Sequence, residues 1–209
     1  MVKGGNFTST KNIQRLKHKN AFPVDIIPFG KIANQEALFT WPPEHETEMN
    51  VLGFDEAYRH SILVRLKTDP QLELRFVSLP GLAILKIMAW KDKYPLRKSD
   101  AKDLLLLIRN YLAAGNENRL YNEEPDLIED DFDYERASAR LLGRDMAAMS
   151  NPKTLETIIE ILDQETGDQS LYRLIQDMRD NKYFQNDFDE FLQLLKHLKT
   201  GILERLKKV

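Results

Sequence analysis

The spacing of the apolar residues changes at Pro80, and this change constrains the fold more than any other feature of the sequence. Before Pro80, residues 62–66 and 72–77 alternate apolar with polar side chains, which indicates strands with one apolar face. The Thr-Asp-Pro-Gln between them is typical of a turn, so the pair predicts a β-hairpin. After Pro80, apolar residues recur at spacings of three and four, which indicates helices. The chain is therefore predicted to be α+β, with an all-helical C-terminal region.

Two further elements are predicted in the first half. Residues 22–29 (FPVDIIPF) are rich in β-branched and aromatic side chains, which indicates a strand. Because proline donates no hydrogen bond to a neighbouring strand, Pro23 and Pro28 indicate either that this strand lies at a sheet edge or that the prolines lie at its own ends. Residues 54–60 predict a short helix.

The helices of the second half are bounded by capping and breaking residues. The first is predicted to begin after Gly81 and to end before Pro95. The second has Ser99 as its predicted N-cap and stops at Gly115. Further helices are expected near residues 132–149, 152–164, 169–181 and 186–207, with Asn151-Pro152 separating two of them.

An apolar stripe runs along the last of these helices. It consists of Phe184, Phe188, Phe191, Leu195, Leu198 and Ile202, at spacings of four and three. Packing on neighbouring helices is the favoured interpretation, and a partner-binding surface is the alternative. Gly201 is expected to weaken this helix near its end, because glycine is a poor helix former.

Composition excludes several classes of protein. The 209 residues are 42% apolar and 30% charged, a balance that can build a core. The absence of cysteine excludes a disulfide scaffold, thiolate metal sites and a cysteine nucleophile. No apolar run approaches the roughly 20 residues of a membrane span, and the basic N-terminus lacks the apolar core of a secretory signal. We therefore expect no membrane partner and a cytoplasmic location.

Charge is unevenly distributed along the chain. Residues 1–20 contain five bases and no acid, whereas residues 117–135 contain nine acids and one base. Because an acidic block this dense repels itself, residues 122–131 are expected to form a solvated acidic connector. The connector separates a predicted α+β domain, residues 1–121, from a helical C-terminal region, residues 132–209.

Asp25 lies in the middle of the apolar segment VDIIPFG. A carboxylate in such a strand is unfavourable unless it pairs with a cation or binds a metal. Carboxylates that project from a strand commonly hold Mg²⁺ beside a phosphate. The alternative is an aspartate on an edge strand that faces solvent.

Lys86 and the loop after its helix form the second group of candidates. Lys86 lies in an otherwise apolar helical run, one turn from Trp90, so its ammonium must reach water or meet an anion. Asp100 and Asp103 share a face at the start of the next helix, where the helix dipole also favours acids. Residues 91–102 contain five bases and two acids, so they form either a phosphate-attracting loop or a solvated charged loop.

Three segments in this order resemble one family of enzymes. They are VDIIPFGKI, FTWPPEHETEMNVLGFDEAYRHSILVRL and LELRFVSLPGLAILKIMAWKDKYPLRKSDAKDLLLLIRNY. They are similar to the later part of AbiEii/AbiGii-type nucleotidyltransferases, which belong to the polymerase-β-like superfamily and include toxins of type IV toxin–antitoxin systems. The resemblance covers roughly residues 14–121, about half of the chain.

The resemblance implies both a fold and an activity. The fold is a nucleotidyltransferase palm of mixed or antiparallel β-sheet with flanking helices, here partial, followed by a helical region. The activity is transfer of a nucleotide from an NTP to an acceptor, which is tRNA in some toxin members. Carboxylates hold Mg²⁺, which bridges the triphosphate and stabilises the attacking and leaving oxygens. Mg²⁺ and an NTP are thus the implied cofactors, and RNA rather than DNA is the implied nucleic acid.

The resemblance also assigns roles to residues of this chain. Asp25 matches the third metal carboxylate of the family, and Lys86 matches a helix lysine that contacts phosphate. Asp100 and Asp103 match the acids of a KDxxDL-like motif, which is SDAKDL here. These four residues are the catalytic candidates, and the basic loop adds three candidate phosphate contacts: Lys91, Arg97 and Lys98.

The sequence departs from the family pattern near its start. Family members carry a Gly-Gly or Gly-Ser turn followed by an Asp-x-Asp strand, which supplies two of the metal carboxylates. Gly4-Gly5 is present here, but no acidic residue precedes Asp25. We therefore expect that the chain begins inside the palm and transfers no nucleotide by itself.

Three hypotheses remain open. A truncated or split nucleotidyltransferase-like protein would expose a sheet edge, which predicts a homo-oligomer or a complementing polypeptide. A binding module without catalysis would engage RNA or a protein through the basic loop and the basic termini. A full-length enzyme with a rebuilt metal site would need Asp25 together with Asp100 or Asp103 as ligands.

Overall fold

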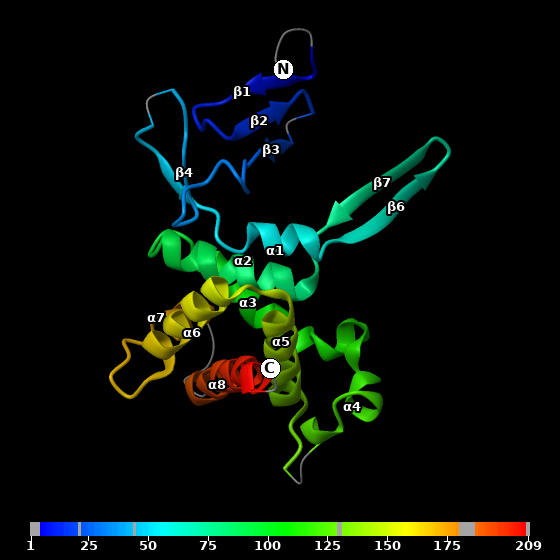
Figure 1. Cartoon of the computed structure of the whole chain (residues 1–209), viewed down its shortest axis with the longest axis vertical. Coiled ribbons are helices and arrows are strands. Elements are labelled where there is room, and N and C mark those ends of the chain that lie inside the picture. The colour runs from blue at the N-terminus through cyan, green and yellow to red at the C-terminus, as the bar shows by residue number, and fades with distance from the viewer. Residues whose placement is uncertain (1–4, 21, 44, 129–130, 180–186, 208–209) are drawn as a thin grey trace. The chain divides into compact units, whose positions relative to one another are not determined.

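The computed structural model describes residues 5–20, 22–43, 45–128, 131–179 and 187–207 (Figure 1). The architecture is α+β, as predicted, with small antiparallel sheets and several helices. The chain forms two compact units, residues 1–54 and residues 55–209. The predicted domain division at residues 122–131 stays a prediction. Within the described ranges, no helix has the length and apolar content that crossing a membrane requires.

The first unit contains two small antiparallel sheets. Strands β1 (Phe7–Ser9), β2 (Arg15–His18) and β3 (Pro23–Asp25) pair in chain order, and β4 (Leu38–Thr40) pairs with β5 (Glu48–Asn50). The strand predicted over residues 22–29 is therefore present but shorter than expected. Ile26 N donates a hydrogen bond to Gln14 O at 2.9 Å. The pairing with β2 ends before Pro28, because proline has no backbone N–H to donate.

The second unit begins with the predicted short helix and hairpin. Helix α1 (Phe54–Arg59) leads into β6 (Ile62–Thr68) and β7 (Gln71–Phe76), which are antiparallel. Ile62 lies opposite Phe76 and Val64 lies opposite Leu74, so the hairpin is confirmed. The two strands extend from the helices of this unit as an arm (Figure 1).

Helices form the core of the second unit. They are α2 (Leu79–Asp92), α3 (Lys98–Asn110), α4 (Arg119–Asn122), α5 (Tyr134–Met149), α6 (Pro152–Thr166), α7 (Arg173–Met178) and α8 (Asp187–Lys207). A turn of π-helix at Leu112–Asn116 and a turn of 3₁₀-helix at Pro125–Leu127 flank α4. Helix α5 packs on α8, α2 and α3, so helices from before and after residues 122–131 share one core. Its fully buried side chains include Ile84, Ile87, Leu104, Ile108, Leu142 and Leu198.

Two of four helix ends agree with the sequence prediction and two differ from it. Ser78 caps α2 by accepting a hydrogen bond from Gly81 N, which puts the start of α2 earlier than predicted. Asn151 caps α6 by accepting from Thr154 N at 2.9 Å, and Gly115 ends the α3 region with a φ of 100°. The predicted N-cap Ser99 is wrong. Helix α3 already begins at Lys98, and no side chain caps its first turn.

The apolar stripe of the last helix packs on its neighbours, as the favoured interpretation predicted. Phe191, Leu195, Leu198 and Ile202 are buried against the rest of the second unit. Phe184 lies outside the described residues. The alternative of a free partner-binding stripe is therefore wrong for these four side chains.

Gly201 has a packing role that its spacing does not reveal. Helices α5 and α8 approach each other so closely that a Cβ at Gly201 would overlap the Arg140 carbonyl oxygen. A Cβ at Gly143 would likewise overlap the Leu198 carbonyl oxygen. The expectation that Gly201 only weakens its helix was incomplete, because the missing side chain is what lets the two backbones meet.

The substitution Gly201→Ala is expected to destabilise the fold. Alanine favours the helix by about 1 kcal/mol, but the overlap with α5 forces the backbones apart at a larger cost. We expect a net loss of about 2 kcal/mol in the free energy of unfolding, measured by urea denaturation. Thr200→Ala, at the exposed neighbouring position, is the control and should stay within about 0.5 kcal/mol of the parent. A Gly201→Ala protein as stable as the control would contradict the close contact.

Candidate functional site

Lys86 is the centre of a polar cluster between α2 and α3. Its Nζ donates to Asp100 Oδ1 at 2.9 Å and to Asp103 Oδ2 at 2.6 Å. Asp100 and Asp103 lie one turn apart on α3, so both carboxylates face α2. The prediction that this ammonium must reach water or an anion is confirmed, because it meets two carboxylates.

The cluster is buried at one end and exposed at the other. Asp100 is 1% exposed. Its Oδ1 also accepts a hydrogen bond from Arg97 Nη2 at 3.2 Å, and Arg97 Nε lies 2.5 Å from its Oδ2. Asp103 is 49% exposed, so the cluster reaches the surface there. Burial alone would lower the pKa of Lys86, but the hydrogen bonds to Asp103 and Asp100 outweigh it and raise that pKa. Lys86 is therefore charged at neutral pH.

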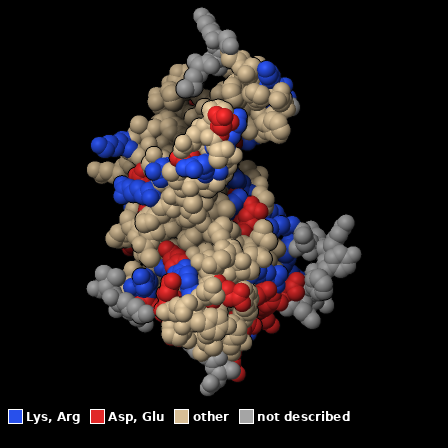
Figure 2. All heavy atoms as spheres, turned by 90° about the vertical axis from the view of Figure 1, so that its right-hand side faces the viewer, with Lys and Arg blue, Asp and Glu red and all other residues tan. Residues whose placement is uncertain are grey.

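The other two predicted phosphate contacts connect the α2–α3 pair to later helices. Lys91 Nζ donates to Gln164 Oε1 on α6 at 2.8 Å. Lys98 Nζ lies 3.3 Å from Asp177 Oδ1 on α7, and the same carboxylate accepts a hydrogen bond from the buried Trp90 Nε1 at 3.0 Å. Basic and acidic side chains lie interspersed over the helices on the face drawn in Figure 2. Residues 91–99 are exposed, and Lys91, Arg97 and Lys98 each lie against a polar or acidic side chain, so the charged loop is solvated and its positive charge is partly compensated.

Asp25 belongs to the first unit and pairs with a cation. Arg15 on β2 lies opposite Asp25 on β3, and its Nε and Nη2 each donate to one carboxylate oxygen at 2.7 Å. This hydrogen bond raises the pKa of Arg15, which keeps the pair ionised. The structure therefore brings together Lys86, Arg97, Asp100 and Asp103, while Asp25 is held in a separate ion pair.

The donor set around Asp25 does not fit Mg²⁺ as it stands. Each carboxylate oxygen accepts a hydrogen bond from Arg15, and the positive charge of that guanidinium opposes a cation at the same carboxylate. Across the ranges that the structure describes, no group of three or more His, Cys, Asp or Glu side chains is arranged to hold a metal. The metal role assigned to Asp25 stays a prediction.

A cavity of about 500 Å³ in the second unit was not foreseen from the sequence. Tyr111 and Asp145 lie in its wall, together with Ile62, Leu79 and Asn116. The Tyr111 hydroxyl donates to Asp145, and Arg119 binds both oxygens of that carboxylate at 2.6 and 2.8 Å. Burial raises the pKa of Tyr111, and the hydrogen bond to Asp145 raises it further, so the phenol stays neutral. These side chains come from different helices, and no local pattern links them.

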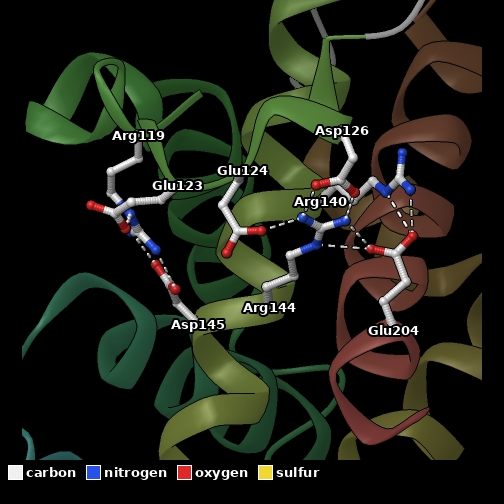
Figure 3. A network of polar contacts seen from close by, with 8 residues as sticks. All are labelled: Arg119, Glu123, Glu124, Asp126, Arg140, Arg144, Asp145 and Glu204. Atoms are coloured by element: carbon white, nitrogen blue, oxygen red, sulfur yellow. Dashed lines mark hydrogen bonds and ion pairs between the residues drawn. The ribbon is translucent and has the colours of Figure 1, made fainter. Parts of the chain in front are cut away.

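A second network surrounds Arg144 on α5 (Figure 3). Arg144, only 4% exposed, donates to Glu124 Oε2 at 2.5 Å, to both oxygens of Asp126, and to Glu204 Oε2 at 2.7 Å. Arg140 donates to the other oxygen of Glu204 at 2.8 Å. Within the predicted solvated connector, Asp126 is 53% exposed, whereas Glu124 is only 13% exposed. Both carboxylates bind the buried Arg144 guanidinium, which offsets the repulsion between them.

Comparison with protein-family models, with curated proteins and with solved structures finds no match to this chain. The resemblance to AbiEii/AbiGii-type nucleotidyltransferases therefore stays a prediction.

Arg144→Met is expected to lower the free energy of unfolding by about 3 kcal/mol, because it leaves three neighbouring carboxylates with only Arg140 to balance them. Equilibrium urea denaturation measures the loss. Arg136→Met is the matched control on the same helix, since Arg136 is half exposed and lies 3.9 Å from Asp133. The control should change stability by no more than about 0.5 kcal/mol. Equal losses in the two variants would show that the buried network contributes nothing specific.

The same network predicts that the stability of the fold depends on pH in the acidic range. The hydrogen bond from Arg144 lowers the pKa of Asp126; burial would raise the pKa of Glu204, but Arg140 and Arg144 outweigh it and lower that pKa too. Carboxyls with lowered folded-state pKa values stabilise the fold above their ordinary values of 3.8 and 4.5, and this stabilisation is lost as the pH falls below them. The urea midpoint should fall less steeply between about pH 5 and pH 3 in Arg144→Met than in the parent. Parallel curves would contradict this linkage.

Proposed function

We propose that this chain is a nucleotidyltransferase-like protein that binds the phosphates of an NTP through Lys86 and transfers no nucleotide by itself. The observation that carries the proposal is the contact of Lys86 with both Asp100 and Asp103. The resemblance assigns roles to these three residues, although they lie on two helices. Their meeting in one cluster supports a shared function.

The cluster has the chemistry of a phosphate contact. An ammonium has three donors, and the two carboxylates take two of them, which leaves a third for a phosphate oxygen. Asp100 and Asp103 hold the side chain in place and favour its charged form. Arg97 and Lys98, which are about half and two-thirds exposed, add positive charge at the start of α3.

The second part of the proposal, that the chain alone transfers no nucleotide, is supported by the Arg15–Asp25 pair. Asp25 is the residue that the resemblance assigns to the metal, and both of its oxygens bind a guanidinium.

A second candidate function is that of a binding module for RNA without catalysis. It is favoured by Lys91, whose partner Gln164 is neutral, and by Lys98, which is 64% exposed although Asp177 is near. Phosphate contacts of this kind weaken as salt rises, because binding releases counterions. Combined Lys91, Lys93 and Lys98→Ala substitutions should then weaken RNA binding and flatten its salt dependence.

The test of the first candidate is calorimetric titration of the full chain with each of the four Mg²⁺–NTPs. Lys86→Met is expected to weaken binding about tenfold, the effect of one hydrogen bond to a charged group. Lys86→Arg, which keeps the charge, should retain more of the affinity. Lys67→Met is the control, because this exposed lysine lies on β6, away from the cluster along the chain.

Two outcomes would overturn the proposal. If no NTP binds, or if Lys86→Met and Lys67→Met bind equally, Lys86 contacts no phosphate. If the chain incorporates labelled nucleotide into RNA and Asp25→Asn abolishes it, the chain is active by itself. Salt-sensitive RNA binding without NTP binding would favour the second candidate.

A further inference from the structure

The β6–β7 hairpin keeps an apolar face in contact with solvent. Leu72, Leu74 and Phe76 alternate along β7 with charged residues, and Val64 and Ile62 lie opposite the last two of these. Leu74 is 47% exposed and Phe76 45% exposed. A hairpin of two strands is marginally stable alone, and a third strand with an apolar face is usually needed. A further strand paired with this hairpin would therefore stabilise it.

The two edges of the hairpin differ in their readiness to pair. On β6 the register shifts between Arg65 and Lys67, and a bulge flanked by bases is a common means of blocking a sheet edge. On β7 the register from Glu73 to Phe76 is regular, and the strand contains no Lys or Pro. Among the described strands, β6 is the one neighbour of β7. The outer edge of β7 therefore lacks the features that usually prevent a sheet edge from pairing with another strand.

The charges of β7 complement a second copy of the same strand. We propose that β7 pairs with β7 of a second copy of this chain, antiparallel and centred on Leu74. In that register Glu73 lies opposite the partner's Arg75, and Arg75 lies opposite the partner's Glu73. Opposite charges on directly facing residues stabilise a strand pair, so the two-fold axis generates two favourable pairs at once.

Neighbouring registers lack this complementarity. Centring the pair on Glu73 sets two carboxylates opposite each other, and centring it on Arg75 sets two guanidinium groups opposite each other, which is unfavourable. The register on Leu74 also matches Leu72 with the partner's Phe76, so all apolar side chains of β7 remain on one face. Two hairpins then form one four-stranded antiparallel sheet.

The local contacts of the two charged residues allow this pairing. Glu73 Oε1 accepts from Arg65 Nε at 3.0 Å, which leaves Oε2 for a further donor. Arg75 donates Nη1 to Ser61 at 3.3 Å and lies over the Tyr58 ring, and a guanidinium has five N–H donors. The proposal is independent of nucleotide binding, because none of these residues belongs to the Lys86 cluster.

The first test measures the mass of the full chain in solution by sedimentation velocity over a range of concentrations. We expect the parent chain to be a dimer that dissociates on dilution. Arg75→Glu and Glu73→Arg should each weaken self-association at least about tenfold, because each sets two like charges opposite each other. An equal mixture of the two variants should dimerise again, because every facing pair is then of opposite charge. Lys67→Glu, on β6 of the same hairpin, is the control and should leave the dimer intact.

The mixing experiment keeps the result decisive if one variant alone is less stable. A monomeric parent chain at all concentrations would overturn the proposal. So would a dimer that both variants retain, because an interface elsewhere, or stacking of the apolar faces, would be insensitive to these charges. Failure of the mixture to associate would also overturn it.

A second test uses the absence of cysteine in the chain. L74C places one thiol on the proposed two-fold axis, where facing residues have the separation that a disulfide needs. Mild oxidation should convert most of L74C to a covalent dimer, whereas L66C, on β6, should stay largely monomeric. Equal cross-linking at the two positions would reject the register centred on Leu74.

Discussion

Helix α5 packs against α8 with backbone meeting backbone at Gly143 and Gly201, and the rest of the second unit is arranged around this contact. The same face of α5 carries Arg140 and Arg144, which bind Glu204 on α8. Helices α2 and α3 pack on α5 in turn. The positions of Lys86, Asp100 and Asp103 therefore depend on how α2 and α3 pack against this helix pair.

The two charged clusters of this unit differ in how they meet solvent. Around Arg144 a buried cation is surrounded by carboxylates from two segments, the one around the 3₁₀ turn at Pro125–Leu127 and α8, and such an arrangement fixes the positions of those segments. Around Lys86 the buried carboxylate is Asp100, while Asp103 extends to the surface. Each cluster has one exposed carboxylate, Asp103 or Asp126, but the Lys86 side chain is 22% exposed and that of Arg144 only 4%. A ligand can therefore reach Lys86 more easily than Arg144, which favours Lys86 as a functional residue.

Periodicity and helix-breaking residues predicted the hairpin and most helices, but not strands β1, β2, β4 and β5 or helix α4. Alternation fixed the hairpin, Asn151-Pro152 fixed a helix boundary, and a lone lysine in an apolar helix pointed to the Lys86 cluster. Apart from the Ser99 cap, the features of the second unit discussed here that the sequence did not predict depend on long-range contacts. The partners of Glu124 and Asp126 lie on another helix, and the space that Gly201 leaves is filled by α5. A local sequence pattern does not show which charged side chain or backbone segment from a distant part of the chain will pack against it.

The hydrogen bond from Trp90 to Asp177 gives the second unit a natural optical reporter. The chain has two tryptophans, Trp41 in the first unit and Trp90 in the second. The Trp90 indole is buried and its N–H is bound to a carboxylate on α7, so its emission will respond when α7 leaves α2. Replacing one tryptophan at a time by phenylalanine would separate the signals, so that the unfolding of each unit is observed without an added dye.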